Sequence, residues 1–395
     1  MSQVYSEDSI RVLKGLEPVK ERPGMYTRTE NPLHIIQEVI DNAADEALGG
    51  FGSVIAVTLH SDGMVSIEDD GRGIPIGIHP EEGVPVIEIV FTRLHAGGKF
   101  NKKDGGAYAF SGGLHGVGVS VTNALSTYLG VTVWRDKQVA SLVFSGGDVT
   151  EALELRPATR GEKKNGTRVT VAPDPKYFDS PNIPQAELER VLRSKAVLMP
   201  GVKVTLTNEK TGQMHTWLYE DGLQGYLREH IEDEPLIPYF GGEWFAPAGD
   251  ETYAKGEGAA WVLAWTAQGG LVRESYVNLI ATPAGGTHEA GFRAALLKGL
   301  KAYAERVGEK RGGILTSEDV IAQAGSLISV FIRNPEFQGQ TKERLSSSSA
   351  QRLVENVLRD PFDHWLTGQP KAAAALLAFV ADRAEERLKR RKDRD

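Results

Sequence analysis

The sequence contains no cysteine among its 395 residues. Disulfide bonds, zinc–thiolate sites and thiol nucleophiles are therefore excluded, and a reducing compartment is compatible with this composition. Long apolar runs are also absent, since the longest, residues 372–381, is far too short to span a bilayer. The N-terminus is polar, with Glu7 and Asp8, and lacks the apolar segment of a signal peptide. We therefore expect a cytoplasmic protein that does not enter the membrane.

A P-loop is missing as well, because no Gly-Lys-Ser/Thr follows the glycine-rich run 111–118. Val121 stands where the third glycine of a kinase or dinucleotide pattern belongs. The formal net charge of −8 argues against a chain that coats DNA over its whole surface. Residues 383–395 do contain seven Lys or Arg and four Asp or Glu. A solvated helix end and a surface that faces nucleic acid both explain that run.

The length predicts two or three domains, each able to bury its own core. Periodicity, caps and turn residues predict helices that pack on a mostly antiparallel sheet, an α+β fold, with a domain boundary near residues 217–222. In the first part we expect helices at 32–48, 86–94 and from within 116–120 to 126, and strands at 54–59, 64–68, 131–135, 139–144, 167–171 and 202–207. In the second part we expect strands at 261–265 and 275–280, and helices at 290–307 and over most of 351–392.

Three segments of the first part carry polar groups in patterns typical of a binding site. On the helix 32–48, Glu38, Asn42 and Asp45 share one face, opposite the apolar Leu33, Ile36, Ile40 and Leu48. The strands 54–59 and 64–68 are predicted to form a hairpin, and the second strand is followed by an acidic turn with two glycines, residues 69–75. The glycine-rich run 111–118 opens a helix, where free backbone amides favour phosphate, and Lys99 is a cation close by in the sequence. Each pattern alone is also compatible with a plain solvent-exposed surface.

The order and spacing of these three segments resemble the GHKL ATPases, which include gyrase, the Hsp90 chaperones, histidine kinases and mismatch-repair ATPases. Within that group the chain is similar to the B subunits of bacterial type II topoisomerases, and residues 24–27 and 340–346 look more like topoisomerase IV than gyrase. The resemblance covers essentially the whole chain, through the segments 22–26, 38–47, 70–75, 94–100, 111–120, 276–280, 285–288 and 340–342. It implies a GHKL (Bergerat) ATPase sandwich with an N-terminal dimerisation arm over residues 1–218. An α+β transducer domain with a C-terminal helix would follow over residues 219–395.

The resemblance also implies roles for single residues. Glu38 matches the general base that activates the attacking water, and His34 matches the residue that orients it. Asn42 matches the ligand of Mg²⁺, for which an amide oxygen is suited. Asp69 matches the carboxylate that reads adenine, with Thr167 helping through water. The metal and the nucleotide implied are Mg²⁺ and ATP.

Further residues match the family's contacts around the nucleotide. The lid over the phosphates corresponds to Tyr108, Gly113, Leu114, His115, Gly116, Val117 and Gly118, with Lys99 as an additional cation. The rim that aminocoumarin inhibitors contact corresponds to Arg72, Gly73, Pro75 and Arg135, and we expect Arg72 to form a salt bridge with Asp45 or Glu46. Gln340 and Lys342 match a loop of the second domain that reaches the γ-phosphate. Tyr5 and Ile10 match the arm that wraps the partner protomer.

These matches predict an ATP-hydrolysing dimerisation gate of a type II topoisomerase, which works with an A-type subunit on double-stranded DNA. A histidine kinase is the rival enzyme, but only about thirty residues precede Asn31, which leaves little room for a phosphoacceptor helix region. A second alternative is a chaperone-like or mismatch-repair ATP clamp on the same fold, which would have no topoisomerase function. The nearest alternative is a gyrase B ATPase region. The family's metal-binding domain, which helps to cleave DNA, has no counterpart here, so we expect a fragment with ATPase activity only.

Overall fold

The computed structural model describes residues 10–94, 118–269, 272–339 and 341–394. These residues divide into two units, which are described separately below. The first unit comprises residues 10–94, 118–194 and 202–217, and the second comprises residues 195–201, 218–269, 272–339 and 341–394. Among the described helices, none is long and apolar enough to cross a membrane.

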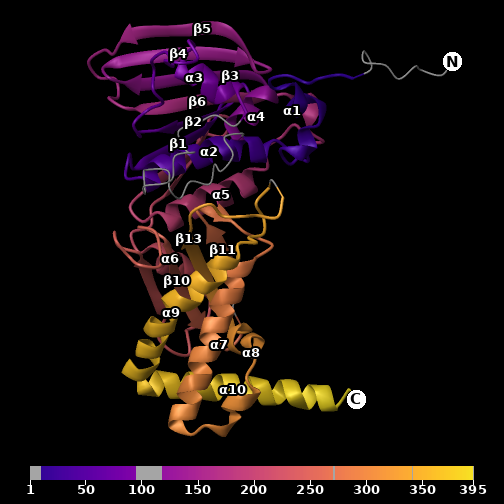
Figure 1. Cartoon of the computed structure of the whole chain (residues 1–395), viewed down its shortest axis with the longest axis vertical. Helices are drawn as coiled ribbons and strands as arrows, with labels where there is room; N and C mark the ends of the chain where they lie inside the picture. Colours follow the sequence, from indigo (N-terminus) through magenta and orange to yellow (C-terminus); the bar gives the residue numbers. More distant parts are fainter. Residues whose placement is uncertain (1–9, 95–117, 270–271, 340, 395) are drawn as a thin grey trace, which may run out of the picture. The chain divides into compact units, whose positions relative to one another are not determined.

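The polar helix expected at 32–48 is α2, Leu33–Leu48, and it begins one residue later than predicted. Pro32 occupies the cap position, while the Asn31 side chain accepts a hydrogen bond from the backbone N–H of Leu33 at 3.0 Å. Ile36 and Ile40 are fully buried, whereas Leu48 at the helix end is only half-buried. The helix packs against α4 and against β1 and β2, so its apolar side faces the sheet (Figure 1).

The described part of the first unit forms an eight-stranded sheet in the order β5-β4-β3-β6-β2-β1-β7-β8. Among these strands only β1 and β7 pair in parallel, so the prediction of a mostly antiparallel sheet is confirmed. The strands are β1 Val54–Leu59, β2 Val65–Asp69, β3 Ser126–Arg135, β4 Gln138–Ser145, β5 Asp148–Pro157, β6 Gly166–Pro173, β7 Lys203–Asn208 and β8 Gln213–Trp217. The helices besides α2 are α1 Glu17–Glu21, η2 Pro23–Met25, α3 Val86–Thr92, α4 Gly118–Ala124, η4 Pro175–Tyr177 and α5 Gln185–Leu198.

The second unit is also α+β, with a five-stranded sheet in the order β12-β11-β13-β10-β9 among its described residues. Its strands are β9 Phe240–Phe245, β10 Gly258–Trp265, β11 Arg273–Val277, β12 Ile280–Ala281 and β13 Ala324–Phe331. Its helices are α6 Gly222–His230, α7 Thr287–Val307, η5 Lys310–Ile314, α8 Ser317–Ile321, α9 Ser348–Gly368 and α10 Pro370–Lys392.

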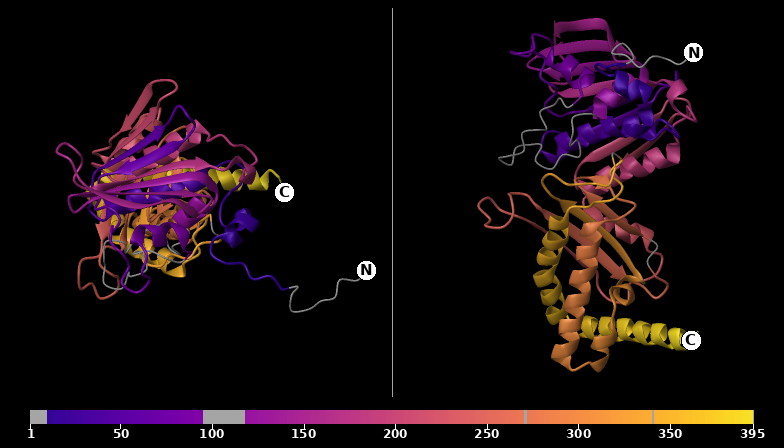
Figure 2. Two further views of the ribbon diagram at one scale, coloured as in Figure 1. Left: turned by 90° about the horizontal axis from the view of Figure 1, so that it is seen from above. Right: turned by 45° about the vertical axis from the view of Figure 1, so that its right-hand side comes forward.

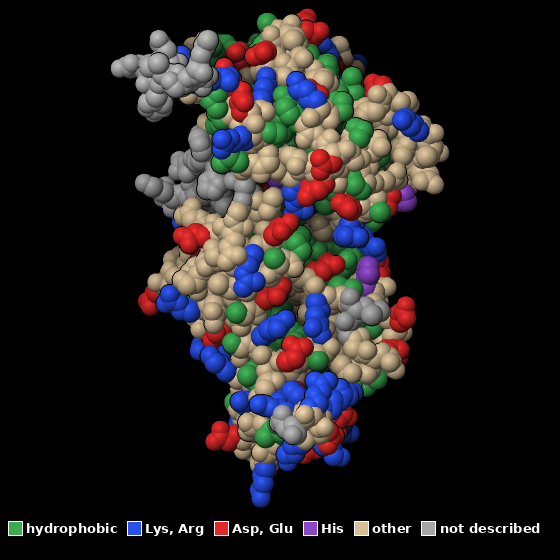
Figure 3. Space-filling view, turned by 90° about the vertical axis from the view of Figure 1, so that its right-hand side faces the viewer, with side chains coloured by type: hydrophobic (Ala, Val, Ile, Leu, Met, Phe, Trp, Pro, Cys, Tyr) green, Lys and Arg blue, Asp and Glu red, His purple; other side chains and the backbone are tan. Residues whose placement is uncertain are grey.

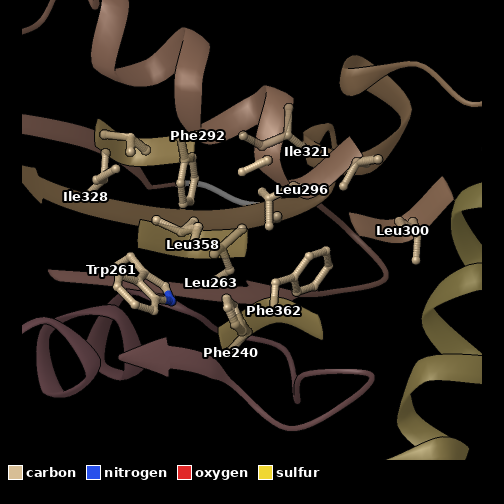
Figure 4. Packing of buried hydrophobic residues seen from close by; sticks show 14 of the residues in the cluster. Phe240, Trp261, Leu263, Phe292, Leu296, Leu300, Ile321, Ile328, Leu358 and Phe362 are labelled. Atoms are coloured by element: carbon tan, nitrogen blue, oxygen red, sulfur yellow. The ribbon is translucent and has the colours of Figure 1, made fainter. Parts of the chain in front are cut away.

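The two long helices α7 and α9 lie side by side over this second sheet (Figure 2). Gly291 and Gly299 of α7 allow the close approach, because a Cβ on either would lie 2.4 Å from the carbonyl of Gln351 or 2.5 Å from the ring of Phe362. Side chains from α7, β10 and α9, including Phe292, Leu263 and Phe362, converge in the core between them (Figure 4). Burying each such side chain contributes about 1.5–3 kcal/mol.

The C-terminal helix α10 is attached to the second unit by a charged pair as well as by apolar packing. The Arg387 guanidinium donates to both carboxylate oxygens of Asp319 at 2.9 and 3.0 Å, and also to the carbonyl of Ile314. Asp319 itself closes a capping box with Thr316 at the start of α8. The far end of α10 presents Lys389, Arg390, Arg391 and Lys392, and Lys and Arg side chains gather there in the space-filling view (Figure 3).

Candidate active site

His34, Glu38 and Asn42 follow one another at single-turn intervals along the half-buried face of α2. The His34 Nε2 atom lies 3.8 Å from Glu38 Oε1, and the two side chains are 11% and 14% exposed. On its other side, His34 Nδ1 lies 2.7 Å from the hydroxyl of Thr27, a buried residue that follows η2. The helix therefore carries a largely buried carboxylate, with an imidazole and a hydroxyl aligned behind it.

The first residue of α4 lies against that carboxylate. A Cβ built on Gly118 would be 2.2 Å from Glu38 Oε2, so only glycine fits here without displacing Glu38. The two helices are joined one turn later, where the Thr122 hydroxyl is 2.7 Å from the carbonyl of Ile35 and 3.2 Å from that of Gly118. This contact holds the start of α4 beside Glu38.

The acidic turn begins at the end of β2, where Asp69 is paired with Thr167 of β6. Asp69 Oδ1 accepts a hydrogen bond from the N–H of Gly71 at 2.8 Å. Burial raises the pKa of Asp69 from 3.8 to about 7, because the hydrogen bond from Gly71 offsets only part of the desolvation and Glu46 adds repulsion. Its neighbour Asp70 has a different task, since its Oδ1 accepts from the N–H groups of Ser53 and Val54 at 2.8 and 3.0 Å.

The remainder of the turn is held by two arginines. The Arg72 guanidinium donates to both carboxylate oxygens of Glu46 at 2.8 and 3.2 Å, which is one of the two salt bridges expected for this arginine. The Arg135 guanidinium donates to the carbonyl of Gly73 at 2.7 Å. Gly73 has φ +81°, which favours glycine, and Pro75 is exposed at the end of the turn. These residues form a half-open rim next to Asp69.

Three residues at this site had no role predicted from the sequence. Thr27 contacts His34, as described above. The Lys163 ammonium donates to the backbone carbonyl of Asp69 at 2.8 Å and lies 5.1 Å from the centre of the Trp134 ring. Thr122 joins α4 to α2. Thr27 lies in a segment that carried the family resemblance, but nothing in the sequence indicated its contact, and Lys163 lies 94 residues from Asp69.

Lys342 belongs to the second unit, where it is buried and has a left-handed backbone, φ +58°. The residues after it are bound to the start of α7. Backbone hydrogen bonds join Ala284 to Glu343 and Leu345 to both Gly285 and Thr287. At Gly286, with φ +142°, a Cβ would lie 2.3 Å from the carbonyl of Leu345. The loop that carries Lys342 is therefore fixed to the N-terminus of a 21-residue helix.

His288, at the start of the same helix, is fully buried, and its Nε2 lies 2.9 Å from the Thr282 hydroxyl. Desolvation lowers the pKa of His288 from 6.5 to about 4, so the ring is neutral at physiological pH.

The remaining predicted site residues lie outside the described residues: Tyr5, Lys99, Tyr108, Gly113, Leu114, His115, Gly116, Val117 and Gln340. In the part of the chain that is described, no group of three or more His, Asp or Glu side chains could hold a metal ion.

Comparison with known proteins shows the family to which the chain belongs. Residues 28–176 match the family model of histidine kinase-, DNA gyrase B- and HSP90-like ATPases, and residues 222–395 match the model of DNA gyrase B. The structure resembles the topoisomerase IV ATP-binding domain of Francisella tularensis, solved with a small-molecule inhibitor, at a TM-score of 0.78 and 39% identity. That match covers 95% of this chain and 99% of the other. The chain belongs to the ATPase domains of the B subunits of bacterial type II topoisomerases.

Two further relatives refine this membership in the topoisomerase B family. The B subunit of DNA topoisomerase 4 from Caulobacter vibrioides is 50% identical over 410 residues, which cover 99% of this chain and 57% of that relative. The chain thus spans a little over half the length of that curated relative. The 43K ATPase domain of Thermus thermophilus gyrase B, solved with an aminocoumarin, is 32% identical at a TM-score of 0.77, over 98% of this chain and 99% of the other. The predictions of the GHKL α+β fold, the ATPase function and the closer similarity to topoisomerase IV are confirmed.

Proposed function

We propose that Glu38 is the general base of ATP hydrolysis in this chain. The observation that carries the proposal is the position of its carboxylate, which lies against Gly118 at the head of α4 and has His34 one turn behind it. Glu38 is half-buried on the polar face of α2. A carboxylate is a weak base, so its contribution comes chiefly from being held where the attacking water will stand.

Asp69 and Thr167 are proposed to bind adenine. A carboxylate accepts a hydrogen bond from the exocyclic amine of adenine, and guanine offers a carbonyl at that position instead. The half-buried setting supports this role, because a hydrogen bond made away from water discriminates more strongly. The same rim, with Arg72, Gly73, Pro75 and Arg135, is proposed to bind aminocoumarins, as the gyrase B relative does.

The phosphates are proposed to lie over α2 and near the start of α4. The lid residues Tyr108 and Gly113 to Gly118, together with Lys99, would cover them, as the family resemblance implies. The fit of Mg²⁺ rests on Asn42, whose half-buried amide oxygen is a hard neutral ligand one turn beyond Glu38. When bound, the ion would neutralise phosphate charge, with the phosphates and water supplying its other ligands.

The second unit is proposed to take part through Lys342 and Gln340. A buried lysine on a loop that is tied by backbone hydrogen bonds to α7 is suited to a point-charge role on the γ-phosphate. Loss of that phosphate on hydrolysis would then remove one contact of the loop. We keep the division into an ATPase domain, 1–218, and a transducer domain, 219–395.

We further propose that ATP closes a homodimer through an N-terminal arm with Tyr5 and Ile10. Within the described residues, Ile10 and Val12 are 56% and 71% exposed, so their apolar side chains are accessible to a second protomer. ATP that is bound by both protomers would favour the closed dimer by mass action. In the whole protein this gate would work in the cytoplasm with an A-type subunit to pass double-stranded DNA.

The base is tested with Glu38→Gln, which removes the charge and keeps the shape. We expect turnover to fall by about 10²–10⁴-fold, while the Kd of a non-hydrolysable ATP analogue changes little. Glu151→Gln, on the exposed strand β5, is the matched control and should keep full turnover. Normal turnover in Glu38→Gln would exclude Glu38 as the base.

The dimer is tested by light scattering with and without the same analogue. We expect the mass to double with the analogue, and Ile10→Ser combined with Val12→Ser to prevent it. Met214→Ser, at an exposed residue of β8, is the control for loss of apolar surface. A monomer under all conditions would refute ATP-driven dimerisation.

A further inference from the structure

Thr27 is a buried residue that contacts the catalytic helix without belonging to it. It is 4% exposed, and its hydroxyl lies 2.7 Å from His34 Nδ1. Its backbone N–H donates to the carbonyl of Pro23 at 3.0 Å, which fixes the residue at the end of η2. The hydroxyl therefore approaches His34 from a rigid turn seven residues upstream.

The contact between the hydroxyl and Nδ1 links the role of Thr27 to the tautomer of His34. A neutral imidazole has one N–H, and the nitrogen that is hydrogen-bonded by a donor becomes the acceptor. His34 Nε2 faces the Glu38 carboxylate at 3.8 Å. A bare nitrogen lone pair there would repel the carboxylate, whereas an Nε2–H attracts it. In the neutral ring Nδ1 is then the acceptor, and Thr27 donates to it.

We propose that Thr27 is a positioning residue for the general base: its hydroxyl donates to His34 Nδ1, holds the proton on Nε2, and so orients the Glu38 carboxylate. The inference rests on the proposed role of Glu38. The hydroxyl has a second acceptor, the carbonyl of Arg28, at 3.4 Å. The shorter distance to His34 favours donation to the ring, because 2.7 Å is an ordinary hydrogen-bond length and 3.4 Å is longer than the usual range.

The proposal predicts different effects for two substitutions of Thr27 that change its size only slightly. Thr27→Val keeps the branched shape and removes the donor, so Nδ1 loses its partner and the proton is free to move to it. Thr27→Ser keeps the donor and removes only a methyl group. A purely structural role for Thr27 in packing predicts the opposite order, with Val tolerated and Ser harmful.

The experiment measures turnover, affinity and the tautomer in the full chain. For Thr27→Val we expect kcat to fall by about tenfold or more, while the Kd of a non-hydrolysable ATP analogue stays within about twofold. For Thr27→Ser we expect kcat within about threefold of the parent chain, since a positioning effect of this kind follows the hydrogen bond. In ¹⁵N-histidine NMR spectra the His34 nitrogens should show the Nε2–H form in the parent chain and in Thr27→Ser, and lose it in Thr27→Val.

Several results would overturn the proposal. They are an unchanged kcat in Thr27→Val, a Ser variant as slow as the Val variant, or an Nδ1–H form in the parent chain. Combining Thr27→Val with His34→Ala should cost no more than His34→Ala alone, because Thr27 acts through His34; additive losses would refute that route. Glu38→Gln distinguishes the two hypotheses. If Glu38→Gln keeps normal turnover, the proposed base is wrong. If Glu38→Gln loses turnover while Thr27→Val keeps the kcat of the parent chain, only the role of Thr27 is rejected.

Discussion

Asp69 and Thr167 face each other across the antiparallel pair of β2 and β6, although they lie almost a hundred residues apart in the sequence. The last residue of one strand thereby meets the second residue of another at the edge of the candidate site. Next to them, a Cβ on Gly166 would lie 2.2 Å from the carbonyl of Asp69, so the two strands close together at this point only because residue 166 is glycine. The carboxylate is held in a partly desolvated place as a result.

The first prediction concerns Asp69 and pH. Its pKa is about 7 in the folded chain and 3.8 as the ordinary value, so the folded state holds its proton more tightly than the unfolded chain. Stability from this group is fully present below about pH 4 and is lost as pH rises through about 7. We expect Asp69→Asn to be more stable than the parent chain at pH 8 by about 2–4 kcal/mol, and equal to it near pH 4.

Urea unfolding at both pH values measures this difference. Asp148→Asn, on the exposed strand β5, serves as the control and should change stability by less than about 0.5 kcal/mol at either pH. If Asp69→Asn were less stable than the parent chain at pH 8, the desolvation account of Asp69 would be wrong.

The second prediction concerns Gly118. An alanine there would place its Cβ 2.2 Å from Glu38 Oε2 and 2.9 Å from Glu38 Cδ, so the carboxylate has to move. We expect kcat to fall by about 10–100-fold, because small displacements of a catalytic group are costly. The thermal unfolding midpoint of Gly118→Ala should not fall below that of the parent chain, since alanine favours a helix by up to about 1 kcal/mol over glycine.

The control for this variant is Gly77→Ala, at a glycine with open space around its Cβ position. Steady-state ATPase assays and thermal unfolding of both variants decide the matter. Full activity in Gly118→Ala would mean that Glu38 need not occupy the observed position.

The third prediction concerns Lys342. We expect Lys342→Asn to lower turnover by about 10²-fold or more, because it removes a charge that would act on the γ-phosphate. Asparagine tolerates the left-handed backbone at this residue, so the loop should keep its shape. ADP has no γ-phosphate, and its Kd should change by less than about twofold. Isothermal titration with ADP, compared with the exposed-site control Lys371→Asn, tests this; a large loss of ADP affinity in Lys342→Asn would contradict the role.

The fourth prediction concerns the pair of Arg387 and Asp319, which ties α10 to α8. Burial by itself raises the pKa of Asp319, but hydrogen bonds from Arg387 and Thr316 outweigh it and hold the pKa below its ordinary value. Arg387→Leu leaves a buried carboxylate without this partner. We expect a loss of about 2–3 kcal/mol at pH 7, less than for a fully buried pair because the Arg387 side chain is 37% exposed.

This loss should shrink as pH falls below the ordinary range of Asp, because the protonated carboxyl no longer needs the guanidinium. Arg390→Leu, at an exposed residue of the same helix, is the control and should change stability by less than about 0.5 kcal/mol. Equal stability of Arg387→Leu and Arg390→Leu in chemical unfolding would show that α10 is held by apolar packing alone.

Several elements could be predicted because their causes are local. The helix α2 combines an asparagine just before its start, a glycine stop and an apolar period of about 3.6 residues. The hairpin of β1 and β2 has the turn residues that such a connection needs. Strand β5 was not predicted, because Glu151 interrupts the alternation of Val149, Leu153 and Leu155 and nearly all of the strand is exposed. Strand β13 is buried on both faces, and a short apolar run of that kind does not distinguish strand from helix.

The sequence by itself determined that His34, Glu38 and Asn42 share one helix face, since residues four apart in a helix are neighbours whatever surrounds them. Family resemblance added the expected chemistry. Only the tertiary structure decided which hydroxyl reaches His34, which glycine borders Glu38, and why Asp69 is hard to ionise. Those properties depend on strand register and on the approach of segments far apart in the chain, and no local pattern encodes the distance between two such segments.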